Sequence, residues 1–344
     1  MKSLKQLNHI LFFILIFFLL LYFGSPFLVP FLFGVFFASL MTPFSNLLEK
    51  LRVTRAISAL LSTLVIFVVV GGILYLLSKQ ISLFVSDISE VREETESVLQ
   101  NIQGYISSLL NVSLEEQRNI WETRSAGIIN RLETWLTNFL GNILNTAAGF
   151  LLVLVYTYLL LFYRNKFVDS LLRYFKEDNE TEVKDVIRQT SKVVHHYLLG
   201  RVKVMALLGI MYYITFLIFD IPFAGLLTIF GALVTIIPYL GPFISGILPI
   251  VFGIIYLEQV GIIILFTLII MTEQVVESYV FEPLIIGSEV QINPLIVIIA
   301  ITLGGMVWGL AGMILFVPMF AIFKIVSSHT PGLEPVSHFL SPSR

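Results

Sequence analysis

Residues 221–257 read IPFAGLLTIFGALVTIIPYLGPFISGILPIVFGIIYL, a run of 37 residues without Asp, Glu, Lys or Arg. A membrane's hydrocarbon core of roughly 30 Å takes about 20 helical residues, so this run is too long for one crossing and too short for two with a turn. Helix breakers stand near its middle, in Pro238-Tyr239-Leu240-Gly241-Pro242. The run therefore predicts a helical hairpin that enters the membrane and turns back, with a broken helix as the alternative.

A second uncharged run, Val290–Phe323, has the same design, with glycines near its middle at 304, 305, 309 and 312. Gly305 and Gly309 also form a GxxxG pattern, which is typical of close helix packing. Irregular backbone is not tolerated against lipid, so both breaks should face protein or a water-filled cavity. The sequence thus predicts two interrupted segments, 221–257 and 290–323, as re-entrant hairpins or broken helices.

The rest of the chain is also that of a membrane protein. Hydrophobic residues make up 57% and charged residues 13%, against about 25% charged in soluble domains. We predict an all-α polytopic membrane protein with about six spanning helices, two hairpins and an outer amphipathic helical segment. The predicted spans are Ile10–Phe23 (a retained signal anchor), Phe27–Leu48, Ala56–Ser78, Gly141–Tyr163, Val204–Phe219 and Gly261–Ile285.

Lys and Arg in the loops predict the orientation, since cytoplasmic loops carry the excess of both. Positive residues gather before the first span, after the second and after the fourth. Both termini are therefore expected on the cytoplasmic side of the cell's inner (plasma) membrane. The predicted parts are helices 1–3 in 1–78, an extracytoplasmic segment 79–140, a fourth helix 141–163, a cytoplasmic segment 164–203 with a helix near 180–199, a transport core 204–326 and a cytoplasmic tail 327–344.

The motifs argue against an enzyme. The sequence contains neither a GxxxxGK[ST] phosphate loop nor an HExxH zinc motif, and its five histidines lie outside the predicted spans. His195 and His196 are interpreted as surface residues. The TVGYG filter of potassium channels is also missing. There is no cysteine, and a net charge of −2 does not favour a nucleic-acid partner. The expected partners are the lipid bilayer and a small solute or cation, with no cofactor or bound metal beyond H⁺ or Na⁺ as coupling ion.

An acidic cluster in the last predicted span contains the residues best suited to bind a solute or an ion. Glu273 and Glu277 are four residues apart and share a helix face, with Gln274 beside them and Glu282 following before Pro283. A carboxylate in the membrane is costly unless it pairs, binds a cation or takes a proton, and no Lys or Arg lies in that stretch. We predict that Gln274 and Glu277 contact the solute or coupling ion, with Glu273 and Glu282 assisting. The alternative is that these side chains emerge at the cytoplasmic surface.

The last 130 or so residues resemble the AI-2E family of transporters. The resemblance rests on an ordered set: Pro238-Tyr239-Leu240-Gly241-Pro242, Pro249, Gln274, Glu277, Glu282-Pro283, Gly287, Pro294, Gly304-Gly305, Gly309, Gly312 and Pro318. Tyr279 departs from the family pattern, in which Asn is common. The resemblance implies a permease, which exports autoinducer-2 in some members and exchanges Na⁺ or Li⁺ for protons in others. It also implies two hairpins and allows homo-oligomers.

These observations predict a secondary transporter of a small polar solute such as autoinducer-2. The breaks would supply backbone carbonyls or gate the path, through Pro238, Gly241, Pro242, Gly304, Gly305, Gly309 and Gly312. Na⁺(Li⁺)/H⁺ antiport is the first alternative, and a non-transporting membrane scaffold is the second.

The orientation can be tested in this cysteine-free chain. Single cysteines at Ser113 and Asn179 should label differently with an impermeant maleimide in intact cells, Ser113→Cys reacting from outside and Asn179→Cys only after lysis. Equal labelling of both from outside would overturn the predicted orientation.

Overall fold

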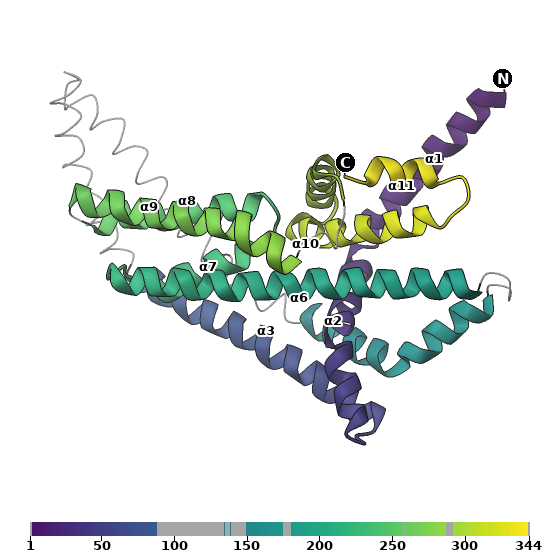
Figure 1. Ribbon diagram of the computed structural model, residues 1–344, viewed down its shortest axis with the longest axis horizontal. Helices are drawn as coiled ribbons and strands as arrows, with labels where there is room; N and C mark the ends of the chain where they lie inside the picture. The colour runs from purple at the N-terminus through teal and green to yellow at the C-terminus, as the bar shows by residue number, and fades with distance from the viewer. Residues whose placement is uncertain are drawn as a thin grey trace. The chain divides into compact units, whose positions relative to one another are not determined.

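The computed structural model describes residues 2–87, 134, 138, 149–174, 180–257, 259–286 and 292–342, in which every regular element is a helix (Figure 1). Six of these helices are long and apolar enough to cross a membrane: Ser25–Lys50, Arg55–Ser86, Gly149–Tyr174, Thr181–Ile218, Val260–Ile286 and Pro294–Ser328. The predicted all-α, polytopic class with about six spanning helices is therefore confirmed. The predicted outer segment 79–140 lies largely outside the described residues.

The chain forms two compact units, which we describe separately. Unit 1 comprises residues 1–69, 148–203 and 282–344, and unit 2 comprises residues 70–147 and 204–281. Unit 1 contains α1 (Lys2–Phe23), α2 (Ser25–Lys50), helix Gly149–Tyr174, α10 (Pro294–Ser328) and α11 (Glu334–Leu340). Unit 2 contains α7 (Ala224–Val234), α8 (Leu240–Tyr256) and α9 (Val260–Val276). Three elements are divided between the units: α3 (Arg55–Ser86), α6 (Glu180–Ile218) and the π-helix η2 (Glu277–Ile286).

The first interrupted run forms a helical hairpin in unit 2, with α7 packed against α8. The helix ends at Thr235, and the chain turns through Pro238 and Tyr239 before α8 begins. Gly241 makes this turn possible, because a Cβ there would lie 2.5 Å from the Thr235 Cα and closer still to the Val234 carbonyl. No other residue fits this approach without moving the backbone.

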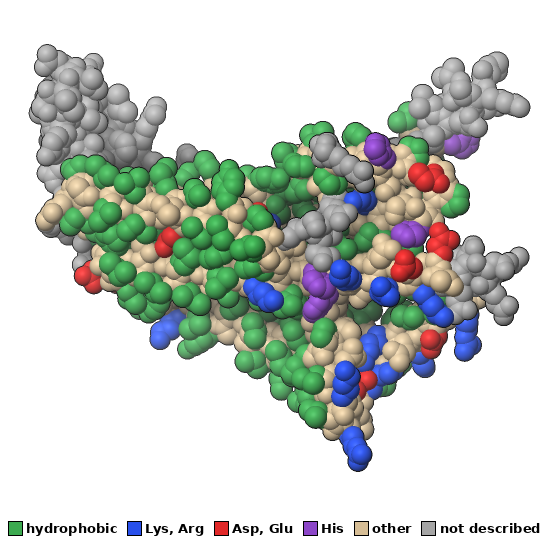
Figure 2. All heavy atoms as spheres, in the orientation of Figure 1, with side chains coloured by type: hydrophobic (Ala, Val, Ile, Leu, Met, Phe, Trp, Pro, Cys, Tyr) green, Lys and Arg blue, Asp and Glu red, His purple; other side chains and the backbone are tan. Residues whose placement is uncertain are grey.

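Large apolar side chains from the hairpin and its neighbours form the core of unit 2. Those on α6 are Leu208, Tyr212 and Phe216, and all three are fully buried. Phe252 of α8 and Phe266 of α9 pack into the same cluster. The outward faces of α8 and α9 are mostly hydrophobic as well, as Figure 2 shows, which suits helices surrounded by lipid.

The second interrupted run forms a hairpin in unit 1, inside the element α10. Trp308 and Gly309 leave helical geometry, and Gly309 adopts φ +59° and ψ −138°, a conformation open to glycine. The two arms then pack so closely that a Cβ on Gly304 or Gly312 would overlap the other's carbonyl. Both runs therefore reverse direction, as expected for hairpins, so Pro294–Ser328 counts among the six candidate spans by its length and composition alone. Entry of the hairpins into the membrane from one side stays a prediction.

Trp308 also ties the second hairpin to the first helix. Its Nε1 donates a 2.8 Å hydrogen bond to the Leu21 carbonyl. Leu21 lies in the last turn of α1, where carbonyls lack a partner within the helix. The indole therefore satisfies a backbone group at the break between α1 and α2, where Gly24 separates the two helices.

Several helices run beyond their predicted bounds: α1 begins at Lys2 and not at Ile10, and helix Gly149–Tyr174 continues past Tyr163. The span 56–78 continues as α3 to Ser86, and the predicted helix 180–199 and span 204–219 form one continuous helix of 39 residues, α6. The sequence suggested boundaries where charged residues begin. Charged side chains do not end a helix, however, because Lys, Arg and Glu are good helix formers.

The close glycine contact at the second hairpin predicts that alanine substitutions at two nearby positions differ strongly in their effect on stability. Gly312→Ala should destabilise the protein by about 1–3 kcal/mol or more, because its methyl group meets backbone that cannot move aside. Thermal unfolding of the purified protein in detergent measures this. Gly305→Ala is the matched control, since its Cβ meets only the flexible end of Met313. Equal stability of the two variants would contradict the hairpin packing.

Candidate functional site

Polar side chains converge inside unit 2, where the first hairpin packs between α6 and α9. We call this group the Gln274 cluster; it consists of Tyr212 and Thr215 of α6, Pro242 and Ser245 of α8, Glu273 and Gln274 of α9, and Glu277 at the start of η2. Tyr212, Ser245 and Glu277 have no exposed surface, and Glu273 is 5% exposed. The cluster is thus a polar interior within apolar helices.

Gln274 connects the hairpin to both flanking helices. Its amide oxygen accepts hydrogen bonds from the hydroxyls of Tyr212 and Ser245, the latter at 3.2 Å. Its amide nitrogen donates to the Pro242 carbonyl at 2.9 Å and to Glu277 Oε2 at 3.3 Å. The reverse orientation would place the amide oxygen against a carbonyl and a carboxylate, so this orientation is favoured. The side chain therefore holds α9 to the hairpin and to α6.

Glu273 has one strong partner and one free oxygen. The Thr215 hydroxyl donates to Glu273 Oε1 at 2.6 Å. The other oxygen, Oε2, is buried and has no hydrogen-bond partner among the described residues. A buried acceptor without a donor is costly. A proton, a cation or a donor on a solute would remove that cost.

Glu277 lies one turn after Glu273, at the junction of α9 with η2. A π-helix is rare and is found often at functional sites. Here Pro283 lies inside it, and proline lacks the N–H that a regular α-helix would use at that position. The Glu277 side chain is completely buried, whereas Tyr279 and Leu284 of the same helix are exposed.

Two glycines make room for the cluster. A Cβ on Gly231 of α7 would lie 2.9 Å from the Tyr212 ring, and a Cβ on Gly246 of α8 would lie 3.2 Å from Gln274 Cγ. The hairpin therefore presents small residues to the two polar side chains that flank it. This close packing fixes the Tyr212 ring and the Gln274 amide against the hairpin.

Glu282 has a different environment from the other three site residues. It belongs to unit 1, where Arg201 Nη1 donates to Glu282 Oε1 at 2.5 Å. The Arg201 side chain is 7% exposed and also lies over the Tyr197 ring, 5.9 Å from its centroid. Gly200 lets η2 approach α6 closely here, since its Cβ would lie 3.0 Å from Ile286. This arrangement is that of a structural ion pair.

The structure therefore divides the residues that the sequence singled out. Glu273, Gln274 and Glu277 come together with Pro242, while Pro238 and Gly241 shape the turn next to them. The remaining candidates belong to unit 1: Glu282 in its ion pair, and Gly304, Gly305, Gly309 and Gly312 in the second hairpin. Glu258, the fourth glutamate of this region, lies outside the described residues.

The chain is similar to known transport proteins over most of its length. The sequence profile described as "AI-2E family transporter" matches residues 11–332, which is nearly the whole chain. The chain belongs to the AI-2E transporter family. It is 23% identical to "Putative transport protein YrrI" of Bacillus subtilis (88% of this chain, 86% of the relative) and 24% identical to "AI-2 transport protein TqsA" of Escherichia coli (93% and 90%).

Membership extends the earlier resemblance from the last third of the sequence to almost all of it. This AI-2E transporter is a multi-pass membrane protein of a transporter family, not an enzyme. The prediction of a transporter is thereby confirmed at the level of the family.

Sequence reasoning missed four residues that the geometry reveals: Tyr212, Thr215, Ser245 and Arg201. The first two are polar groups three residues apart in an apolar span, so they share a helix face, and that spacing was a usable signal. The contacts of Ser245 and Arg201 depend on chain segments far away in sequence and gave no local signal. His195, interpreted as a surface residue, is half-buried, with its Nδ1 3.2 Å from the Ser39 carbonyl.

The ion pair predicts that Glu282 contributes to the stability of the protein and does not contact the transported solute. Glu282→Gln should lower the free energy of unfolding by about 1–3 kcal/mol, because a charged hydrogen bond to a buried guanidinium is weakened. The apparent affinity for a transported solute should stay unchanged. Thermal unfolding and uptake kinetics on the same preparation measure the two effects.

The double variant Arg201→Met/Glu282→Leu serves as the control, since replacing both partners by apolar groups can restore stability. A changed solute affinity in Glu282→Gln at unchanged stability would show that Glu282 is a ligand after all.

Proposed function

We propose that this AI-2E transporter is a secondary transporter of the bacterial inner membrane and that the Gln274 cluster binds a small polar solute. The observation that carries the proposal is a half-buried amide, two buried carboxylates and three buried hydroxyl side chains converging next to the turn of a helical hairpin. Polar groups inside apolar membrane segments are expensive and mark solute or ion pathways. Interrupted helices at such positions are a recurring feature of transporter binding sites.

The chemistry of the cluster limits the class of solute. Its members provide carboxylate and carbonyl acceptors together with hydroxyl and amide groups, and none of them is Lys or Arg. Such a site suits a neutral molecule with several hydroxyl groups, or a cation, and it repels an anion. Because one relative is named for AI-2 transport, autoinducer-2 is the first solute to test.

The two carboxylates supply a mechanism for coupling. Glu273 and Glu277 lie one helical turn apart and are both buried. Neighbouring carboxylates in a poorly solvated site raise one another's affinity for protons and cations. We therefore propose that H⁺ or Na⁺ binds at this pair and that its release accompanies solute release. The same observation favours Na⁺(Li⁺)/H⁺ antiport as the second candidate function.

The hairpin turn gives the site a means of responding to its occupant. Gln274 donates to the Pro242 carbonyl, which belongs to the first turn of α8. A solute that competes for the Gln274 amide would release that carbonyl, and a shift of α7 and α8 would open or close access. In this proposal Pro238, Gly241 and Pro242 form the moving turn.

The second hairpin, at Gly304 to Gly312, is proposed as a further gating element. Cytoplasmic termini, the division of the chain into the predicted parts and assembly into homo-oligomers remain part of the proposal.

The central prediction concerns Glu277. Glu277→Gln keeps the size and hydrogen bonding of the side chain but removes its charge and its ability to bind a proton. In proteoliposomes this variant should lose the pH- or Na⁺-dependent part of solute flux, while its expression and thermal stability stay near those of the unmodified protein.

Glu182→Gln provides a matched control. Glu182 lies exposed on α6, so this variant protein should transport the solute normally. Autoinducer-2 uptake and pH-gradient-driven Na⁺ movement are measured on the same liposomes, so that loss of one and not the other separates permease from antiporter. Wild-type flux and wild-type pH dependence in Glu277→Gln would refute the proposed role.

A further inference from the structure

A second polar site lies in unit 1 and shares no residue with the Gln274 cluster. A cavity of about 440 Å³ opens between α2, helix 149–174 and the first half of α6. Its lining is Ser39, Thr42 and Pro43 of α2, Val168 of helix 149–174, and Lys184, Ile187, Arg188, Ser191, Lys192 and His195 of α6. We call it the basic pocket. Neither Asp nor Glu belongs to this lining.

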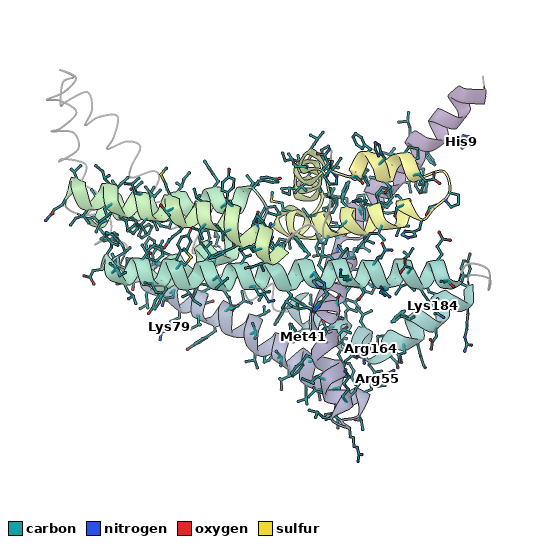
Figure 3. The ribbon with its side chains drawn as sticks, in the orientation of Figure 1. His9, Met41, Arg55, Lys79, Arg164 and Lys184 are labelled. Carbon is teal, nitrogen blue, oxygen red and sulfur yellow. The ribbon has the colours of Figure 1, made fainter. Side chains whose placement is uncertain are left out.

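The basic side chains come from one face of α6. Lys184, Arg188 and Lys192 follow one another at intervals of four residues, and His195 continues the same face three residues later. Figure 3 labels Lys184 on the first turns of this helix, and Figure 2 shows Lys, Arg and His side chains gathered over the same region. Like charges four residues apart repel one another in a helix. A bound anion would lie close to several of these positive charges at once and would be attracted by each of them.

The opposite wall supplies uncharged hydrogen-bonding groups. Ser39 Oγ is buried and has no hydrogen-bond partner among the described residues. His195 Nδ1 lies 3.2 Å from the Ser39 carbonyl, a contact that links α6 to this part of α2. The Thr42 hydroxyl already donates to the Ala38 carbonyl at 2.7 Å, so the Ser39 hydroxyl is the donor that this wall offers to a phosphate oxygen. Together these groups form a built wall rather than a loose surface.

Pro43, Val168 and Ile187 give the same pocket an apolar portion. Basic groups beside apolar surface, next to helices that span a membrane, match a phosphate headgroup with the start of its acyl chains. A free phosphate would use only the basic part of the lining. The mixed lining therefore favours the lipid as the source of the phosphate.

We propose that the basic pocket binds a phosphate group, supplied by the headgroup of an anionic phospholipid. Arg188 and Lys192 hold the phosphate oxygens, with Lys184 and His195 adding positive charge. Occupation of the pocket would link α2 to α6 through the ligand. Since α6 also carries Tyr212 and Thr215, membrane composition would act on the same helix that holds the Gln274 cluster.

The experiment uses the purified full chain in nanodiscs. Three samples are compared: neutral phosphatidylcholine, phosphatidylcholine with added phosphatidylglycerol, and phosphatidylcholine with inorganic phosphate in solution. The readouts are the unfolding temperature and the phosphatidylglycerol retained by the protein after detergent extraction. Both are independent of transport, so their outcome is separate from that of the Glu277 experiment.

The double variant Arg188→Gln/Lys192→Gln removes two charges from the pocket. Arg173→Gln/Lys203→Gln removes the same charge from exposed positions outside it and reports the general attraction of the protein to anionic lipid. Each basic residue near a membrane surface contributes appreciably to that attraction. The pocket variant should lose roughly tenfold or more of the apparent phosphatidylglycerol affinity relative to the control.

Stabilisation by phosphatidylglycerol that is lost in the pocket variant and kept in the control supports the proposal. If inorganic phosphate alone stabilises the protein, and this effect is lost in the pocket variant and kept in the control, the pocket is a phosphate site but its assignment to a lipid is wrong. Equal loss in both variants, or no stabilisation by either anion, overturns the pocket as a binding site.

Discussion

A helix that turns back inside an apolar segment frees backbone groups that lipid cannot satisfy, so the turn must pack against protein. Both hairpins meet this constraint by close approach of their arms. Gly241 allows it against Thr235 in the first hairpin, and Gly304 and Gly312 allow it in the second. Trp308, at the turn of the second hairpin, also donates its indole N–H to the Leu21 carbonyl at the end of α1. The positions of these glycines therefore decide the architecture of the C-terminal half.

The same constraint determines where the polar side chains lie. Apolar residues such as Ile210, Ile214 and Leu217 of α6 are about half exposed, whereas Tyr212 on the same helix is fully buried. A helix in lipid gains nothing by hiding apolar groups from its surroundings, but it must place hydrogen-bonding groups inward. Packing a hairpin between α6 and α9 supplies that interior. The Gln274 cluster is its result, and a polar interior of this kind can exchange its internal hydrogen bonds for those of a solute.

The class of fold and the positions of both reversals were predictable because they depend on local signals: uncharged length, Pro238 and the run of glycines from 304 to 312. Contacts between residues far apart in the sequence were not predictable, because no local signal marks them. Tyr212 meets Gln274 from 62 residues away, and Arg201 meets Glu282 from 81 residues away. Glu282 was grouped with Glu277 because only five residues separate them. The sequence could not show that Arg201, on a helix taken for two separate segments, would neutralise one carboxylate and leave the other to the cluster.

The continuity of α6 explains why these glutamates differ. Arg201 and Tyr212 are eleven residues apart, about three helical turns, so they lie on nearly the same face of this helix. The first places a guanidinium against Glu282, and the second places a hydroxyl against Gln274. A carboxylate paired with a guanidinium already has a counter-charge and has little capacity left to bind a cation. Carboxylates surrounded by hydroxyl and amide groups, such as Glu273 and Glu277, keep that capacity, because those groups stabilise a negative charge far less than a guanidinium does. One helix therefore gives one acidic residue an ion-pair partner and leaves two others among hydroxyl and amide groups, where we propose that they bind the solute or coupling ion.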